Sequence, residues 1–407
     1  MIRVLFLITT FRQGGAERSL YELVRHIDRE RFAPQVACLE GEAYYSERFR
    51  SLGVPVHHLG LRALGPPAMG AGSSQLKAFG ALCGRLAWLA GLLRRERVQV
   101  LQTLLLHANL AGRFAGTLAR TPVVVGGVRT ADPRHWHTLL DGLTFALTRG
   151  EVCVSGHVRR FQASRAGLPL GALTVIPNGV DAADFPVSAA PFGLGEPEGL
   201  SGRLAARAEL GLPPDRPVLA FLGRLAPAKA LPDLLSAFAV VAARDERPLL
   251  ALAGDGPLAA WVRGEVRRLG LGERVVLTGW VSQPARLYAA ADAFVLSSVV
   301  EGMPRTVLEA MASGLPVVST DAPGCGELIV EGRTGLIVPR RKPRDLTDAL
   351  LGLLSDPERA AEFGRRGRER AFAEFNVADL TRRYEALYVR LLQSALRPAR
   401  QPARASR

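Results

Sequence analysis

The chain opens with Met1-Ile2-Arg3-Val4-Leu5-Phe6-Leu7-Ile8-Thr9-Thr10-Phe11-Arg12-Gln13-Gly14-Gly15-Ala16-Glu17, an apolar run followed closely by paired glycines. Consecutive apolar residues at 4–8 predict a strand that is buried on both faces, as in a parallel sheet. A helix should begin at Gly15 or Ala16, because apolar residues then recur at helical spacing. These residues are Leu20, Leu23, Val24 and Ile27. The stretch therefore predicts a strand, a glycine turn and a helix.

The same alternation of short apolar runs and helix-like segments continues along both halves of the chain. In the first half, the expected strands are residues 3–8, 35–39, 98–101, 123–128, 151–154 and 173–176. In the second half, they are residues 218–222, 249–253, 275–278, 293–296, 316–319 and 336–338. The pattern predicts an α/β protein of two doubly wound, Rossmann-like domains that face a cleft. Ligands of such sheets bind beyond the carboxyl ends of the strands.

A length of 407 residues exceeds what one hydrophobic core usually serves, so two domains are expected. We expect an N-terminal domain over residues 1–185 and a C-terminal domain over residues 203–376. The Pro- and Gly-rich stretch 186–202 shows no periodicity and is interpreted as the linker. Residues 377–396 predict a terminal helix that crosses back toward the N-terminal domain, and the basic tail 397–407 is expected to be disordered. The apolar face of this helix comprises Leu380, Tyr384, Leu387, Tyr388 and Leu391.

A formal net charge of +14 should draw the protein to polyanions, namely nucleic acid, an anionic membrane surface or phosphate-bearing substrates. The absence of basic motifs interleaved with aromatic residues argues against a nucleic-acid partner. Four arginines concentrate part of this charge shortly before the tail. They are Arg365, Arg366, Arg368 and Arg370. They form either a solvated helix face or a membrane contact.

Cysteine usage and hydropathy indicate a reducing compartment and no membrane span. The cysteines are scattered singly, as expected of buried free thiols, and no cluster has metal-ligand spacing. They are Cys38, Cys83, Cys153 and Cys325. The N-terminal apolar run is too short for a signal peptide, and the stretch 76–93 is interrupted by Lys77 and Arg85. We expect a cytoplasmic protein that is peripheral on the inner face of the plasma membrane.

Two cations follow the expected strand 218–222 in Gly223-Arg224-Leu225-Ala226-Pro227-Ala228-Lys229. The planar fork of Arg224 and the compact charge of Lys229 could together hold a diphosphate at the carboxyl end of the strand. They could also stabilise the charge that develops on a departing nucleoside diphosphate. The alternative is that both are ordinary solvated surface residues.

A second polar loop, residues 297–309, follows the expected strand 293–296 and leads into a helix. Pro304 suits the first helical turn, which leaves backbone N–H groups near residues 303–306 free to bind phosphate or sugar oxygens. Glu301 and Glu309 would then accept hydrogen bonds from hydroxyl groups on different parts of one extended ligand. Alternatively, Glu301 is a capping or surface residue and Glu309 is the buried partner of a cation.

The ordered set of motifs resembles glycosyltransferase family 4 over almost the whole chain. The set comprises Gly14-Gly15-Ala16-Glu17, Ile176-Pro177-Asn178-Gly179-Val180-Asp181, the Gly-Arg-Leu-x3-Lys loop at 223–229, Gly254-Asp255-Gly256-Pro257, and Glu301 with Glu309 as Glu-x7-Glu. The resemblance implies the GT-B fold and the transfer of a hexose, with retention, from a nucleotide-diphosphate sugar to a hydroxyl of a glycan or lipid-linked acceptor. It implies a role in cell-surface polysaccharide or glycolipid synthesis, with no cofactor and no metal.

The resemblance also implies roles for individual residues. Arg224 and Lys229 would bind the donor diphosphate, Glu301 the sugar hydroxyls and Glu309 the ribose, while the Gly14-Gly15 turn approaches donor phosphate or acceptor. The full donor set is Gly14, Gly15, Gly223, Arg224, Lys229, Glu301, Gly302, Met303, Pro304, Thr306 and Glu309. The expected catalytic residues are Arg224, Lys229, Glu301 and His107. The leaving diphosphate, rather than a protein nucleophile, would help to deprotonate the acceptor.

The resemblance departs from the family pattern at one position. Many members carry a His just beyond the fourth strand, and the matching residue here is Leu104, while His107 stands three residues further on. We expect His107, Asn109 and Arg129 to bind the acceptor. The alternatives are that His107 caps the following helix and that Arg129 forms a structural salt bridge.

Two rival functions remain open from the sequence. One is a nucleotide-sugar epimerase of GT-B fold, and the other is a non-catalytic scaffold associated with membranes. The intact Arg224, Lys229, Glu301 and Glu309 argue against a decayed enzyme. A lipid-linked acceptor is favoured, because it would account for the basic surface and for the apolar, Arg-bearing segment 76–97.

Overall fold

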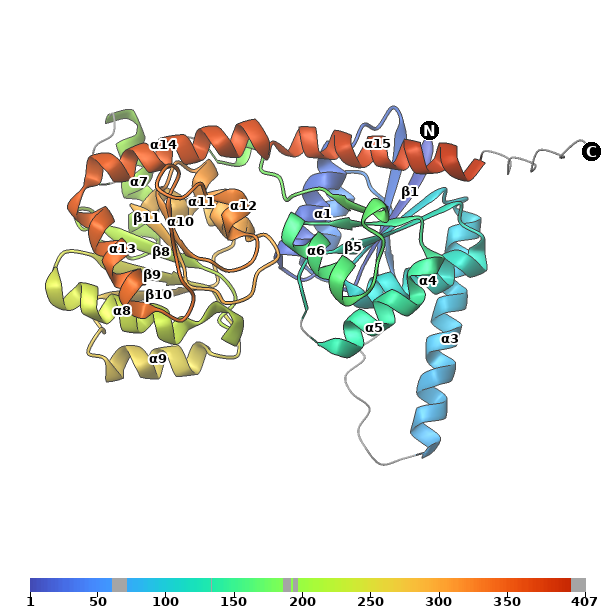
Figure 1. Ribbon diagram of the computed structural model, residues 1–407, viewed down its shortest axis with the longest axis horizontal. Helices are drawn as coiled ribbons and strands as arrows, with labels where there is room; N and C mark the ends of the chain where they lie inside the picture. Colours follow the sequence, from blue (N-terminus) through green and yellow to red (C-terminus); the bar gives the residue numbers. More distant parts are fainter. Residues whose placement is uncertain (61–71, 133, 186–191, 193–196, 397–407) are drawn as a thin grey trace, which may run out of the picture. The chain divides into compact units, whose positions relative to one another are not determined.

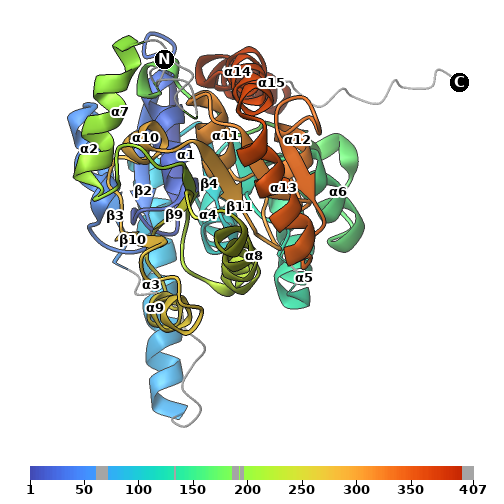
Figure 2. The ribbon, with the colours of Figure 1, turned by 90° about the vertical axis from the view of Figure 1, so that its left-hand side faces the viewer.

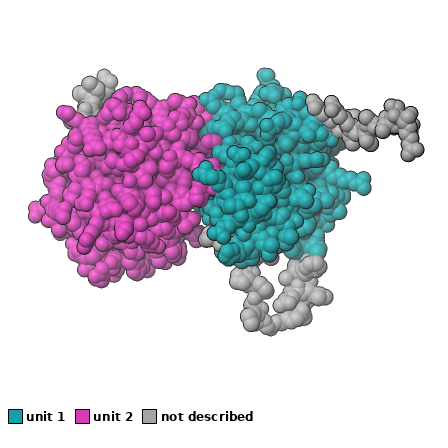
Figure 3. Space-filling model, in the orientation of Figure 1, with its two compact units in different colours: residues 1–154, 158–176, 378–407 teal, residues 155–157, 177–377 magenta. Residues whose placement is uncertain are grey.

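The computed structural model describes residues 1–60, 72–132, 134–185, 192 and 197–396. The chain divides into two compact units (Figure 3). Unit 1 comprises residues 1–154, 158–176 and 378–407, and unit 2 comprises residues 155–157 and 177–377. The predicted tail 397–407 lies outside the described residues.

Unit 1 is built on a parallel sheet of seven strands in the order β3-β2-β1-β4-β5-β6-β7. The strands are β1 (Ile2–Ile8), β2 (Phe32–Cys38), β3 (Val56–His58), β4 (Val100–Leu104), β5 (Val123–Val128), β6 (Gly150–Cys153) and β7 (Leu173–Val175). Six of them were predicted. The edge strand β3 was missed because its three residues, Val-His-His, form no apolar run.

Helices cover both faces of this sheet (Figure 1). They are α1 (Gly15–His26), α2 (Tyr44–Ser51), α3 (Gly72–Arg95), α4 (Leu106–Ala119), α5 (His135–Thr144) and α6 (Gly156–Arg165). Successive side chains of a strand point to opposite faces, so Phe6 packs in the core formed with α1 and α2, while Leu5 and Leu7 pack in the core formed with α3 and α4. Helix α1 begins at Gly15, as predicted.

The terminal helix α15 (Val377–Leu396) belongs to unit 1 from residue 378 onward. Its buried face packs in the same core as Phe6, and the Tyr388 hydroxyl donates a hydrogen bond of 3.0 Å to Gln102 Oε1 on β4. The buried residues of this face are Leu380, Leu387, Tyr388 and Leu392, with Tyr384 and Leu391 partly buried. The apolar stripe that the sequence predicts is therefore the face that packs.

Unit 2 contains a parallel sheet of six strands in the order β10-β9-β8-β11-β12-β13. The strands are β8 (Val218–Leu222), β9 (Leu249–Ala253), β10 (Val275–Gly279), β11 (Ala293–Leu296), β12 (Val317–Thr320) and β13 (Leu336–Val338), and all six were predicted. The helices are α7 (Pro197–Glu209), α8 (Leu231–Arg244), α9 (Ala259–Arg268), α10 (Pro284–Ala290), α11 (Arg305–Ala312), α12 (Cys325–Leu328), α13 (Pro343–Ser355) and α14 (Pro357–Glu374). Helices α8 and α13 pack side by side (Figure 2).

The predicted linker 186–202 is partly wrong, because α7 begins inside it at Pro197. This helix is anchored by charge rather than by an apolar stripe. Asp292, which precedes β11 and is fully buried, accepts hydrogen bonds from Arg203 and Arg207 on α7, the latter at 2.8 Å, and from the Val218 backbone at 2.7 Å. Periodicity alone could not predict such a helix.

Two smaller expectations can be compared with the structure. Of the four arginines of α14, Arg365 and Arg366 lie on a solvated face and pair with Glu362, whereas Arg370 pairs with Glu374 and Arg368 donates to backbone carbonyls. Cys83 is exposed, whereas the other three cysteines are buried free thiols as predicted.

Candidate functional site

In unit 2, the loop that carries Arg224 and Lys229 packs against the glycines that follow β9. The Gly223 N–H donates to the Ala253 carbonyl at 3.0 Å. Gly254 adopts a φ of 135°, and a Cβ atom there would lie 1.9 Å from the Gly223 carbonyl oxygen. Only glycine allows this approach of two backbone segments. The Gly-Asp-Gly-Pro motif therefore shapes the loop of residues 223–229, which we call the cation loop.

Lys229 and Glu301 meet at the carboxyl ends of β8 and β11. The Lys229 ammonium lies 2.5 Å from Glu301 Oε1, and the Ser298 hydroxyl donates to the same oxygen at 2.7 Å. The Ser297 hydroxyl donates to the Lys229 carbonyl at 2.7 Å. Both charged groups are largely but not fully buried. The structure thus brings together the two residues that the sequence assigned to diphosphate and sugar.

Arg224 is exposed and, among the residues that the structure describes, its guanidinium has no hydrogen bond or ion pair. An unpaired guanidinium keeps its full capacity for bidentate binding of a phosphate group. The loop therefore presents one free cation and one cation held by a carboxylate.

Helix α11 begins at Arg305, so Pro304 is the capping residue rather than part of the first helical turn. The turn before the helix is held by the Ile-Pro-Asn-Gly motif. The Asn178 amide donates to the Met303 carbonyl at 2.8 Å, and Arg305 donates to the Gly179 carbonyl at 3.1 Å. Gly324, at a φ of 84°, allows close packing against the carbonyl of Gly302. The predicted donor residues Gly302, Met303 and Pro304 thus lie in one fixed turn, and Thr306 follows in the first turn of α11.

Glu309 is the buried partner of a cation, as one of the two sequence interpretations stated. Its side chain accepts hydrogen bonds from Arg305 at 3.3 Å and from the Tyr288 hydroxyl at 3.1 Å, and the residue is 5% exposed. A carboxylate has about four acceptor positions, so two bonds leave capacity for a ribose hydroxyl. Ribose binding by Glu309 stays a prediction.

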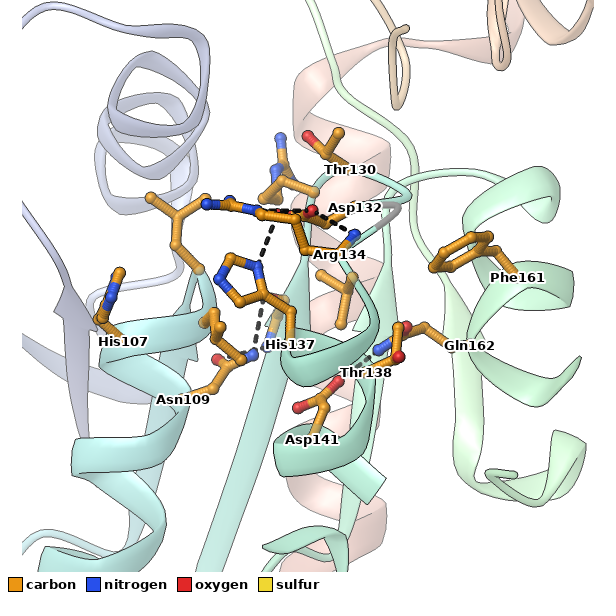
Figure 4. Close-up of a pocket in the computed structure, with 15 residues that line it drawn as sticks. His107, Asn109, Thr130, Asp132, Arg134, His137, Thr138, Asp141, Phe161 and Gln162 are labelled. Carbon is orange, nitrogen blue, oxygen red and sulfur yellow. Dashed lines mark hydrogen bonds and ion pairs between the residues drawn. The ribbon is translucent and has the colours of Figure 1, made fainter. Parts of the chain in front are cut away.

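Unit 1 has a pocket of about 310 Å3 beyond the carboxyl ends of β4 and β5 (Figure 4). Residues from the end of β5, from the segments after β4 and β5, and from α4, α5 and α6 line it. They are Leu105, Leu106, His107, Asn109, Gly127, Val128, Arg129, Thr130, Asp132, Arg134, His137, Thr138, Asp141, Phe161 and Gln162. Leu105 adopts φ 74° and ψ 153°, a backbone region that is essentially reserved for glycine and costs about 1–3 kcal/mol. Such strain clusters at functional sites.

All three predicted acceptor residues line this pocket, but they differ in what they can offer. Asn109 is structural: its side chain bonds Thr103 and both backbone groups of Gly127. Arg129 donates to the Ser19 hydroxyl at 2.7 Å. His107 is the second residue of α4 and is exposed, and partial desolvation of its ring together with the nearby His137 and Arg134 lowers its pKa.

Sequence reasoning missed the Asp132–His137 pair. His137 Nδ1 lies 2.6 Å from Asp132 Oδ2, and Arg134 donates to both carboxylate oxygens. Burial raises the pKa of Asp132, but the hydrogen bonds from Arg134 and His137 outweigh it and hold this pKa at about 2. The stretch 132–137 contains no motif that would have singled out the pair.

The Gly14-Gly15 turn is covered by a carboxylate. A Cβ atom on Gly14 would lie 2.3 Å from Glu17 Oε2, so the Glu17 side chain folds back over the start of α1. Burial raises the pKa of Glu17 to about 7, against the opposing charge of Arg129. A ligand could reach the Gly14 backbone only if this side chain moved, so ligand binding at the turn stays a prediction.

Beneath the pocket, a buried charge network joins α4, α5 and β6. Arg113, which is fully buried, pairs with Asp141 at 2.8 Å and with Glu151, and Gln162 donates to Asp141. Burial, with the charge of Asp141, raises the pKa of Glu151 to about 8, although Arg113 opposes this. The Arg113 guanidinium thus pairs with the carboxyl groups of both Asp141 and Glu151.

Comparison with known families covers both units. Residues 13–184 match the family described as Glycosyltransferase Family 4, and residues 203–370 match Glycosyl transferases group 1. The chain belongs to glycosyltransferase family 4. The resemblance drawn from the motifs is thereby confirmed.

Relatives of this family 4 chain include D-inositol 3-phosphate glycosyltransferase 2 of Catenulispora acidiphila, 37% identical over 179 residues, which are 41% of this chain and 42% of the relative. The GDP-mannose-dependent alpha-(1-6)-phosphatidylinositol monomannoside mannosyltransferase of Mycobacterium tuberculosis is 32% identical over 232 residues, which are 54% of this chain and 57% of the relative. The chain thus spans about half the length of the curated relatives it matches.

Solved structures confirm the fold of this family 4 chain. HepE of Anabaena, in complex with UDP, matches with a TM-score of 0.80 and 20% identity, covering 96% of this chain and 100% of that chain. Sucrose-phosphate synthase from Thermosynechococcus elongatus matches with a TM-score of 0.76 and 20% identity at the same coverage. The predicted architecture of two Rossmann-like domains is confirmed.

Proposed function

We propose that this chain is a retaining glycosyltransferase. It moves a hexose from a nucleotide-diphosphate sugar, bound by unit 2, to a hydroxyl of a glycan or lipid-linked acceptor, bound by unit 1. The reaction serves cell-surface polysaccharide or glycolipid synthesis at the inner face of the plasma membrane. It needs no cofactor and no metal, because protein cations neutralise the diphosphate. Family membership supports the reaction class, while the substrates are our proposal.

The observation that carries the proposal is the pairing of Lys229 with Glu301 beside the free Arg224. Glu301 neutralises Lys229, whose ammonium lies 2.5 Å from Glu301 Oε1. A diphosphate bound here would supply the negative charge for both cations and leave the Glu301 carboxylate able to accept bonds from sugar hydroxyls. The donor would thus replace Glu301 as the partner of Lys229.

The chemical step follows from these charges. The bond between the anomeric carbon of the sugar and the diphosphate oxygen breaks, and a bond from that carbon to the acceptor oxygen forms on the same face. The acceptor proton passes to the leaving diphosphate, whose developing charge Arg224 and Lys229 stabilise. Removal of one such positioned donor typically slows an enzyme about 100- to 1,000-fold.

A membrane-bound acceptor is supported by an exposed apolar surface on unit 1. Phe114 and Leu118 on α4 and Trp136, Leu139 and Leu143 on α5 are exposed, and these two helices pack together. Exposed apolar patches mark interaction sites on soluble proteins. In the part of the chain that the structure describes, no helix has the length and apolar character needed to cross a bilayer.

The reaction is tested by a donor screen. Purified protein is incubated with UDP-, GDP- and ADP-sugars, with and without a lipid extract of the source cells and with and without EDTA, and nucleoside diphosphate release is followed. Lys229→Ala should lose at least about 100-fold in rate, whereas Lys342→Ala, an exposed lysine of the same unit, should retain it. The anomeric configuration of the product reports retention.

Three outcomes of this screen would contradict the proposal. Release with none of the donors would refute the transferase, release independent of the extract would refute the lipid-linked acceptor, and loss in EDTA would refute the metal-free step.

The membrane contact is tested by flotation with vesicles of phosphatidylglycerol and phosphatidylethanolamine. The double variant Leu139→Asp/Leu143→Asp should lose most vesicle binding, because a carboxylate is costly at the apolar boundary. Val240→Asp, at an exposed apolar position of unit 2, should bind as the wild type does. Equal binding of all three proteins would refute this docking surface.

A further inference from the structure

His137 has an unsatisfied ring nitrogen in the pocket of unit 1. The residue is 6% exposed, and its Nε2 atom is buried with no hydrogen-bond partner among the residues that the structure describes. In Figure 4, the imidazole lies between Asp132 and His107. A buried polar atom that lacks a partner is rare in folded proteins and calls for an explanation.

The tautomer of the neutral ring follows from its other contact. Asp132 is an ionised acceptor, and the Arg134 side chain donates to both of its oxygens, at 2.9 Å to Oδ1 and 2.5 Å to Oδ2. The Nδ1 atom of His137, at 2.6 Å from Asp132 Oδ2, must therefore donate. In the neutral ring, Nε2 is then left with a lone pair, so it can accept a hydrogen bond from a ligand.

The charges around the pocket are already engaged. Arg134 bonds Asp132, Arg129 bonds Ser19, and Asp141 pairs with Arg113. The lowered pKa of His107 also favours a neutral ring there. The pocket therefore presents neutral donors and acceptors, which suit hydroxyl groups better than a phosphate or carboxylate.

We propose that this pocket binds the hydroxyl-bearing sugar or polyol end of the acceptor, and that His137 Nε2 accepts a hydrogen bond from one of its hydroxyls. Asp132 is a positioning residue that fixes the ring and its tautomer. The inference rests on the proposed function, since it assumes that unit 1 binds the acceptor.

The size and walls of the pocket support this ligand class. A volume of about 310 Å3 lies at the lower end of the range of small-molecule pockets, which fits one ring rather than an oligosaccharide. Thr130 and Thr138 add hydroxyl groups, and Phe161 lies across the pocket from His107 in the view of Figure 4. An aromatic wall suits the apolar C–H face of a sugar ring.

The test compares acceptor and donor saturation in two substitutions of one side chain. His137→Phe keeps a planar ring and removes both nitrogens, while His137→Gln retains an oxygen that can accept. In the extract-dependent assay, His137→Phe should raise the half-saturating concentration of the lipid extract about tenfold, the effect of one lost hydrogen bond. The KM of the donor and the melting temperature should stay unchanged, and His137→Gln should recover part of the loss.

The matched control is His135→Phe, because His135 is exposed at the start of α5 and does not line the pocket. The inference would be overturned if His137→Phe left the half-saturating concentration of the lipid extract unchanged, or raised it only as much as His135→Phe does. Either result would leave the proposed transferase function standing. An equal rise in the donor KM, or a loss that His137→Gln does not relieve at all, would make the role structural and also overturn it. No release by the wild type with any donor would refute the proposed function itself.

Discussion

The two units place their charges differently. In unit 2, Arg224 is exposed and has no partner in the described part of the chain, while Lys229 and Glu301 form an incompletely buried pair. In unit 1, Arg113 is fully buried and shared between two carboxyl groups of the protein. The cations of unit 2 are thus available for a diphosphate. The buried charges of unit 1, namely Arg113, Asp141 and Glu151, form a frame that holds the pocket in shape. Substitutions of the cations should therefore lower the reaction rate, whereas substitutions in this frame should lower the free energy of unfolding.

The largest expected effect is on the frame of unit 1. Arg113→Ala leaves Asp141 and Glu151 buried without their cation, and breaking a buried ion pair in this way costs about 3–5 kcal/mol. Urea unfolding should show the loss, and hydrogen exchange should locate it in α4, α5 and β6. Arg149→Ala, at an exposed position of the same unit, is the control. If both variants lost the same free energy of unfolding, the Arg113 network would not be a main source of the stability of unit 1.

The second prediction concerns the free cation of unit 2. Arg224→Ala should lower kcat about 100- to 1,000-fold, equivalent to about 2.7–4 kcal/mol, because one of two cations that stabilise the leaving diphosphate is gone. Its unfolding free energy should stay within about 0.5 kcal/mol of the wild type, as is usual for exposed residues. The comparison is Arg263→Ala, an exposed arginine on α9. A loss of stability without a loss of rate would reverse the contrast between the units.

The same contrast explains what the sequence could predict. The strands of unit 2 are apolar runs, so the sequence predicts all six. The residues of its cation loop fall in motifs of the family, so the resemblance indicates roles for them. Which polar side chains are buried, and which partners they bind, could not be predicted in the same way. Asn109 was expected to bind the acceptor, but its amide is used by Thr103 and Gly127, while His137 was overlooked. Partners across strands and turns depend on the folded geometry, which no local pattern encodes.

The smallest expected effect is a pH dependence within the frame of unit 1. The pKa of Glu151 is raised by burial and by Asp141 from 4.5 to about 8. Between these values the folded chain keeps a proton that the unfolded chain has lost, so the free energy of unfolding falls as the pH rises. The slope is at most about 1.4 kcal/mol per pH unit. Glu151→Gln cannot ionise and should remove this part of the slope.

Urea unfolding from pH 5.5 to 8.5 measures this difference, with Glu273→Gln at an exposed position of unit 2 as the matched control. A wild type and a Glu151→Gln variant with equal slopes would mean that Arg113 keeps both carboxyl groups ionised. The frame of unit 1 would then carry a net negative charge beneath the pocket. Neutral hydroxyl groups would lose their advantage there over a ligand with a cationic group, because an uncompensated buried carboxylate attracts positive charge. The protonation of one buried residue therefore bears on which acceptors the pocket can bind.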